Sequence, residues 1–221
     1  LTRGMSDDPH SRHVETLASE TMRHGLQGRV TGSHLTSMHS MDNYFVSKLL
    51  MLMHEAQLHV VANPLINITL QGRHDTYPKR RGMTRVPEQM AAGLNVAFGH
   101  DCVMDPWYPL GSADLLEVAH MGLHVAQMTS REGMRQCFEA VTTNPARVLG
   151  LEGYGLAPGN AADFVVLQAA DPIEAIRLRA NRLWVVRRGK VVAQTPRLES
   201  EVQWLGQPHT ENFLFTPGTR T

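Results

Sequence analysis

The chain has 221 residues, 42% of them hydrophobic and 19% charged, which is an ordinary composition for one or two globular domains. Its 21 lysines and arginines balance its 21 aspartates and glutamates, so no overall charge favours nucleic acid or a membrane as a partner. No apolar run approaches the ~20 residues of a membrane span, the first residues lack a signal-peptide core, and two cysteines make no disulfide framework, so we expect a cytoplasmic protein.

Helical and strand patterns alternate over the first two thirds of the chain. In order, we expect a helix over 10–26, a strand ending at His34, a helix over 42–56, a strand ending at Pro64, a loop over 65–85, a short helix over 86–92, a strand ending at Asp101, and helices over 112–128, 132–142 and 144–151. The strand ends are roughly 30 to 40 residues apart, the size of a strand–helix–strand unit. This alternation predicts an α/β fold with a parallel sheet, as in a (β/α)₈ barrel, whose active site lies where the strands end.

The pattern changes after about residue 150. A Pro-Gly turn and an apolar strand are followed by two short strands around Arg188 and Gly189, which is typical of a hairpin. We therefore predict a partial barrel over 1–150, a small β module over 151–195, and an irregular tail over 196–221.

The stretch "TGSHLTSMHS" places His34 at a strand end. A histidine there can bind a metal or hold a reacting oxygen, or it can simply be hydrogen-bonded in the core. Its place at a strand end favours a functional role for His34 more than for His39, His54, His59 and His74.

The stretch "NVAFGHDC" ends an apolar strand with Asp101. A carboxylate is costly to bury unless it is paired, hydrogen-bonded or metal-bound. An aspartate here can ligate a divalent metal and accept a proton from the metal-bound water. The alternative, a helix cap, is disfavoured because the next helix begins near Ser112 or Asp114. Cys102 is either a packing residue or a thiol that lines the pocket.

The stretch "DPWYPLG" forms a stiff aromatic loop after this strand. Two prolines restrict its backbone, and Trp107 offers a flat face for a planar ring. A hydrophobic plug beneath the loop is an equally good interpretation of the same residues.

The stretch "YPKRRGMTR" concentrates four basic residues. Phosphate or nucleic-acid contact is one interpretation. Because the net charge is zero and no aromatic platform for stacking accompanies the cluster, an exposed loop or a subunit contact is favoured, with no nucleic acid and no membrane as partner.

Long stretches of the chain resemble one enzyme family. "VTGSHLTSMHS", "VVANPLINITLQGRHDTYPKRRGMTRV", "NVAFGHDCVMDPWYPLGSADLLEVAHMGLHVAQM" and "NPARVLGLEGYGLAPGNAADFVVL" are similar to bacterial cytosine deaminase of the amidohydrolase superfamily, from about Asp7 to about Thr195. The resemblance implies a metal-dependent (β/α)₈ barrel with an appended β-sandwich, which hydrolyses cytosine to uracil and ammonia. This chain then corresponds to the C-terminal half of the barrel plus part of the small β-sandwich.

The resemblance also assigns roles to four residues. It implies that Asp101 ligates a divalent metal ion, iron or zinc, one per complete site, and takes a proton from the bound water. His34 contacts that water and stabilises the developing charge. Cys102 stands where the family often has a second acid that touches the pyrimidine, and Trp107 stands near the ring.

The chain departs from the family where other metal ligands are expected. No H-x-H pair occurs, and Thr2 and Met5 stand where the family has a metal-binding histidine and a proton-shuttling glutamate. We expect that the N-terminal half is missing, with Met5 a possible start codon, and that the chain is inactive alone. A half barrel has open edges and should bind the missing half or another copy of itself. The alternatives are an inactive fragment, or an amidohydrolase that acts on isocytosine, creatinine or a triazine.

Overall fold

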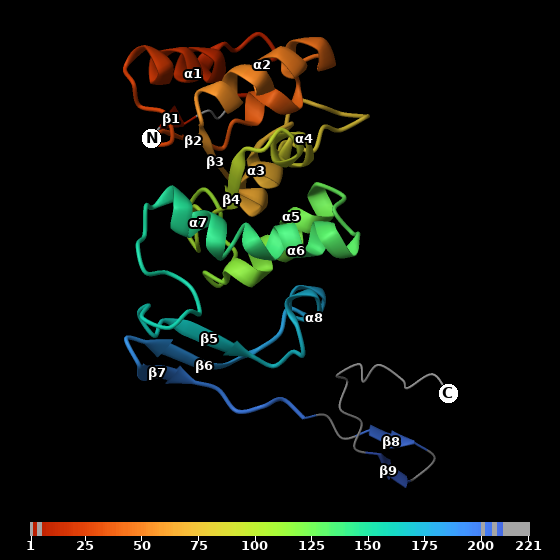
Figure 1. Cartoon of the computed structure of the whole chain (residues 1–221). Coiled ribbons are helices and arrows are strands. Elements are labelled where there is room, and N and C mark those ends of the chain that lie inside the picture. Colours follow the sequence, from red (N-terminus) through yellow and green to blue (C-terminus); the bar gives the residue numbers. More distant parts are fainter. Residues whose placement is uncertain (1, 4–5, 200–201, 205–206, 210–221) are drawn as a thin grey trace, which may run out of the picture. The chain divides into compact units, whose positions relative to one another are not determined.

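The protein is described by a computed structural model that covers residues 2–3, 6–199, 202–204 and 207–209, with side chains from 6 to 199 (Figure 1). It divides into two compact units, Leu1–Glu152 and Gly153–Thr221. Within the described residues, no helix combines the length and the apolar character needed to cross a membrane.

The first unit is built on a parallel sheet. Its strands are β1 (Thr2–Arg3), β2 (Thr31–Ser33), β3 (His59–Ala62) and β4 (Asn95–Phe98), in the order β1-β2-β3-β4. Neighbouring strands pair in parallel, each with the next in the chain. The predicted alternating units of a partial (β/α) barrel are therefore confirmed. The sequence patterns missed β1, because a two-residue strand contains no apolar run to detect.

Helices connect the strands of the first unit. They are α1 (His13–Arg23), the 3₁₀ turn η1 (Thr36–His39), α2 (Asn43–Glu55), α3 (Pro64–Leu70), α4 (Val86–Ala91), α5 (Leu115–Val125), α6 (Arg131–Glu139) and α7 (Thr143–Val148). Side-chain caps begin three of them, through Asp42, Asp114 and Ser130. Asp114 caps the N-terminus of α5, as expected, so Asp101 is not the cap of this helix.

The loop predicted over 65–85 is wrong in its first part. Helix α3 starts at Pro64, directly after β3, and buries Leu65 and Ile66. Asn63-Pro64 does stop the strand, but proline is also preferred in the first turn of a helix, where its missing N–H costs nothing. The turn that ends β3 therefore also starts α3.

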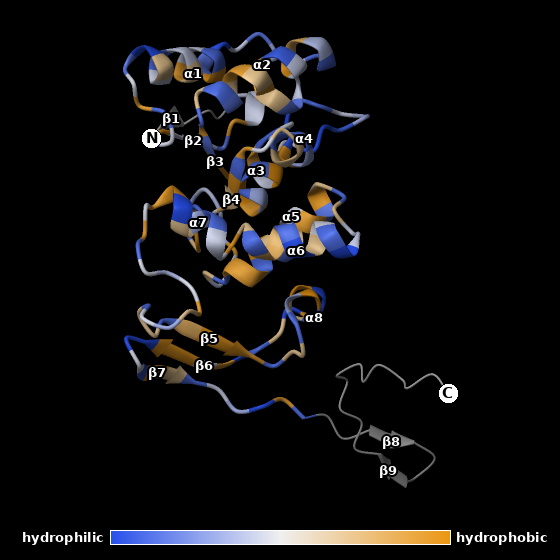
Figure 2. Ribbon diagram, in the orientation of Figure 1, coloured by the Kyte–Doolittle hydropathy of each residue, from blue (hydrophilic) through white to orange (hydrophobic). Residues whose placement is uncertain are grey.

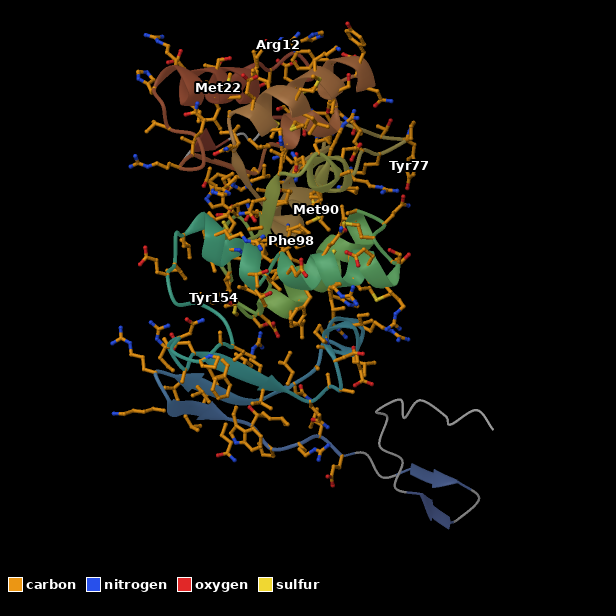
Figure 3. The ribbon with its side chains drawn as sticks, in the orientation of Figure 1. Arg12, Met22, Tyr77, Met90, Phe98 and Tyr154 are labelled. Carbon is orange, nitrogen blue, oxygen red and sulfur yellow. The ribbon has the colours of Figure 1, made fainter. Side chains whose placement is uncertain are left out.

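The core of the first unit lies between the sheet and its helices. Val60 of β3 and Val96 of β4 are fully buried, as are Met53 of α2 and Ala18 of α1. Figure 2 shows apolar residues concentrated along the inner strands and hydrophilic residues along the outer faces of the helices. Phe98 ends β4 in the middle of this unit (Figure 3), where it contacts α5 at Gly122, so closely that an added Cβ would lie 2.5 Å from its ring.

The second unit contains antiparallel strands. β5 (Phe164–Leu167), β6 (Arg182–Arg187) and β7 (Lys190–Gln194) pair in that order, with helix α8 (Pro172–Leu178) between β5 and β6. The predicted hairpin is confirmed, since Arg188 and Gly189 both have positive φ in its two-residue turn. Within the predicted tail, β8 (Val202–Trp204) and β9 (Gln207–His209) form a separate pair, and residues 200–201, 205–206 and 210–221 lie outside the described part.

Candidate functional site

The predicted catalytic residues meet at the carboxyl edge of the parallel sheet. His34 follows β2 directly, and Asp101 comes shortly after β4. His34 Nε2 lies 3.4 Å from Asp101 Oδ2, with side-chain exposures of 4% and 34%. The histidine is thus buried, while the carboxylate remains open on one side to a substrate or to solvent.

The backbone at these two residues is unusual. His34 has φ of 70° and Asp101 has φ of 64°, both in the left-handed region that non-glycine residues seldom adopt. Each such residue costs on the order of 1–3 kcal/mol, and these conformations cluster at functional sites. The two left-handed residues are thus the same two whose side chains approach to 3.4 Å after their strands end.

Two asparagines determine which nitrogen of His34 carries the proton. The backbone N–H of Asn63 donates to Asn67 Oδ1 at 3.2 Å, so the amide nitrogen of Asn67 must face the other way. That nitrogen donates to His34 Nδ1 at 2.9 Å, and Asn63 Nδ2 lies 3.2 Å from the same atom. Because Nδ1 accepts, the proton of the neutral ring is on Nε2, which faces Asp101.

Asn67 was not among the residues predicted from the sequence. It lies four residues after Asn63, and the two share one face only because α3 begins at Pro64. The two asparagines stand at helical spacing in "NPLIN", but this spacing was not used because a loop was expected there.

Gly99 makes room for Asn63 at the end of β4. A Cβ on Gly99 would lie 2.4 Å from Asn63 Oδ1, closer than real contacts allow. We expect Gly99→Ala to lower the free energy of unfolding by about 1–3 kcal/mol through overpacking, measured by denaturant unfolding. In the double variant Gly99→Ala with Asn63→Ala, the clash disappears, so the two losses should be clearly less than additive. Additive losses would show that the contact does not constrain this edge.

Cys102 follows Asp101 directly in the chain, and Trp107 lies in the loop that continues from it. Trp107 is 69% exposed, whereas its neighbour Tyr108 is buried and packs edge-on against His100. The plug beneath the loop is therefore Tyr108. Trp107 is not part of this plug, and its role as a wall for a ring stays a prediction.

Asp105 organises this aromatic loop. Its Oδ1 accepts the backbone N–H groups of Trp107 and Tyr108, each at 2.9 Å. The Tyr108 bond, together with the Cys102 thiol and the Trp107 bond, lowers the pKa of Asp105 below its ordinary value. The Cys102 thiol thus bonds to a loop carboxylate, and its predicted contact with a substrate stays a prediction.

The part of the chain that the structure describes does not form a metal site by itself. No group of three or more histidine, cysteine, aspartate or glutamate side chains suited to a metal ion occurs among the described residues. Asp101 offers a carboxylate, but His34 Nε2 carries a proton in the hydrogen-bond pattern above, and protein zinc sites use three or four ligands. Thr2 lies in β1, while its side chain and Met5 fall outside the described part.

Comparisons with known proteins match most of the chain. A profile described as "Amidohydrolase family" matches residues 5–193. The solved 5-methylcytosine deaminase of Klebsiella pneumoniae, liganded with 5-fluorocytosine, superposes with a TM-score of 0.85 at 42% identity, over 88% of this chain and 47% of that one. The N-isopropylammelide isopropylaminohydrolase of Burkholderia multivorans gives 0.71 at 30% identity, over 82% and 43%.

A curated relative matches a similar share of the chain. A pterin deaminase of Rhizobium rhizogenes is 32% identical over 84% of this chain and 43% of its own length. The chain therefore spans less than half the length of each of these proteins.

Proposed function

Because this chain belongs to the amidohydrolase family, we propose that it forms part of an active site that deaminates a planar heterocycle by hydrolysis, with cytosine as the ring. The reaction adds water at the ring carbon that carries the amino group. A carbon–oxygen bond forms, the carbon–nitrogen bond breaks, and uracil and ammonia are the products.

The paired Asp101 and His34 carry this proposal. Asp101 is partly exposed, so its carboxylate can reach an attacking water and accept the proton that the water loses. His34 presents Nε2–H beside it, which suits a donor to the oxygen as negative charge develops there. The buried asparagines hold the ring in this orientation, so no reorganisation is needed during the reaction.

Two further groups have to come from elsewhere. Deamination also requires an acid that protonates the ring nitrogen and the leaving ammonia. We propose that this acid, and the ligands that would hold a divalent metal ion together with Asp101, lie on polypeptide equivalent to the part of the relatives that this chain does not match. Association with that part, or with a second copy, is the corresponding proposal for its partner.

The names of the relatives guide the choice of substrate. The solved relative at 42% identity is named for 5-methylcytosine and holds 5-fluorocytosine, and both are cytosines substituted at C5. The curated relative at 32% identity is named for a pterin. The 5-methylcytosine deaminase is more similar to this chain than the pterin deaminase is, so it supports cytosine as the substrate ring. A pterin, isocytosine, creatinine and a triazine are the rings that a test must include.

The test is reconstitution. The chain is co-expressed with the unmatched part of the Klebsiella enzyme, and ammonia release is measured with each ring and added zinc or iron. We expect turnover of cytosine or 5-methylcytosine by the pair and none by either part alone. Robust turnover by the 221 residues alone would place the missing groups within this chain. Preference for another ring by the pair would overturn the choice of cytosine.

A further inference from the structure

We propose that a basic hollow in the first unit binds a small organic phosphate, independently of the deamination site. This basic hollow is a cavity of about 380 Å³. Its charged lining residues are His39, Lys79, Arg80, Arg81, Arg85 and Glu88. The loop between α3 and α4 carries four of these residues, Lys79, Arg80, Arg81 and Arg85, and it projects from the unit with exposed Tyr77 near its tip (Figure 3).

Arg80 is held rigidly at the hollow. Its Nε and Nη2 donate to the two carboxylate oxygens of Asp75 at 2.7 and 2.9 Å, and Nη1 donates to the Asp7 carbonyl at 3.2 Å and to the Ser40 hydroxyl. The guanidinium lowers the pKa of Asp75 to about 2, and the carboxylate raises the pKa of Arg80. Both groups are therefore charged at neutral pH, and Asp75 offsets the charge of Arg80.

Arg85 is also held in place, but mostly by neutral groups. Its Nε donates to the Met38 carbonyl at 2.9 Å, its Nη1 donates to Asn43 Oδ1 at 2.7 Å, and its Nη2 donates to the Met41 carbonyl. Glu88, half exposed, lies 3.7 Å away. Carbonyl oxygens orient a guanidinium without cancelling its charge, so Arg85 is preorganised for an anion.

Among the described residues, Lys79 and Arg81 have no carboxylate partner. Arg81 donates to the Val125 carbonyl at 3.0 Å, and Lys79 lies 3.5 Å from the Asp75 carbonyl. No ion pair joins either of them to an acidic side chain in the described part of the chain. Three carboxylates lie near the four permanent cations of the hollow: Asp75 and Glu88 pair with Arg80 and Arg85, and Asp7 pairs with His39 and also acts on Arg80. Among the described residues, the four permanent cations still exceed these acids by one, although the whole chain is neutral. This local excess of positive charge favours an anion.

The size and the other walls favour an organic phosphate over a bare ion. A volume of about 380 Å³ is in the range of small-molecule sites, which is far more than inorganic phosphate fills. Met83, Pro87 and Val125 add apolar surface to the lining. No phenylalanine, tyrosine or tryptophan is among the described residues that line it, so they offer a base nothing to stack on, and a sugar phosphate is the better class of ligand.

The experiment is calorimetric titration of the 221-residue chain with ribose 5-phosphate, inorganic phosphate and ribose. We expect saturable binding of ribose 5-phosphate at one site, weaker binding of inorganic phosphate and none of ribose. The double variant Lys79→Ala with Arg81→Ala should weaken binding about tenfold or more, since charge-assisted hydrogen bonds are lost. The matched control, Lys48→Ala with Arg73→Ala, removes the same charge outside the hollow and should bind as the unmodified chain does.

A variant that binds more tightly shows that a change in affinity does not come from unfolding. Glu88→Gln removes the one carboxylate of the lining, so it should tighten binding severalfold while circular dichroism stays unchanged. Absence of saturable binding by the unmodified chain, equal weakening in both double variants, or unchanged affinity in Glu88→Gln would each overturn the proposal. So would a result in which the hollow variants change only the oligomeric state, because the cluster would then be a subunit contact. None of these readouts depends on deaminase activity.

Discussion

Asp101→Asn is expected to lower kcat of the reconstituted enzyme by about 10²–10⁴-fold, the usual contribution of a general base. The amide keeps the size of the side chain but cannot accept the proton that the attacking water loses. Asparagine also tolerates the left-handed backbone found at this position, where φ is 64°, so the fold should survive the change. The measurement is ammonia release under saturating substrate, together with thermal unfolding of the variant.

The matched control is Asp105→Asn in the same loop. Asp105 is also an aspartate, but its Oδ1 accepts the loop N–H groups of Trp107 and Tyr108, and an amide oxygen can do the same. It should retain most of the activity. If both variants lost activity equally, Asp101 would not be the specific proton acceptor, and the activity would depend on the conformation of the whole loop. If Asp101→Asn kept full activity, the assignment of the base would be wrong.

Asn67→Asp is expected to reverse the tautomer of His34 and to lower kcat by about 10–100-fold, as changes behind a reacting group commonly do. The carboxylate can still accept the Asn63 N–H, so the turn into α3 is kept. Facing His34 Nδ1, however, it accepts where the amide donated, so the proton moves to Nδ1. Nε2 then lacks the hydrogen that it presents toward Asp101.

The readout that separates this effect from general damage is the ¹⁵N spectrum of the His34 ring. In the unmodified chain, Nε2 should be the protonated nitrogen, and in Asn67→Asp it should be Nδ1. Asn144→Asp is the control, because Asn144 is another buried asparagine, which donates to the Val96 carbonyl at 2.9 Å. It should reduce stability without changing the His34 spectrum. Protonated Nδ1 in the unmodified chain would contradict the hydrogen-bond pattern itself.

The sequence alone was enough to predict the class of fold, and it placed His34 and Asp101 at strand ends. The apolar runs before His34, Asn63 and Asp101 predicted parallel strands, because strands buried on both faces are continuously apolar and are separated by helical spacing. The pattern also placed His34 and Asp101 at strand ends, where the active site of such a barrel lies. That their side chains approach to 3.4 Å is known only from the structure.

Only the tertiary structure decided how each side chain is used. Asn67 became part of the site because α3 turns it back onto β2, a contact between residues 33 positions apart that no local pattern encodes. Tyr108 rather than Trp107 became the buried aromatic, because Asp105 fixes the turn that directs them. The basic residues of 79–85 became the lining of a hollow through bonds to carbonyl groups of η1, of α5 and of Met41. Composition and spacing determine which elements form, whereas long-range hydrogen bonds decide which atoms face one another.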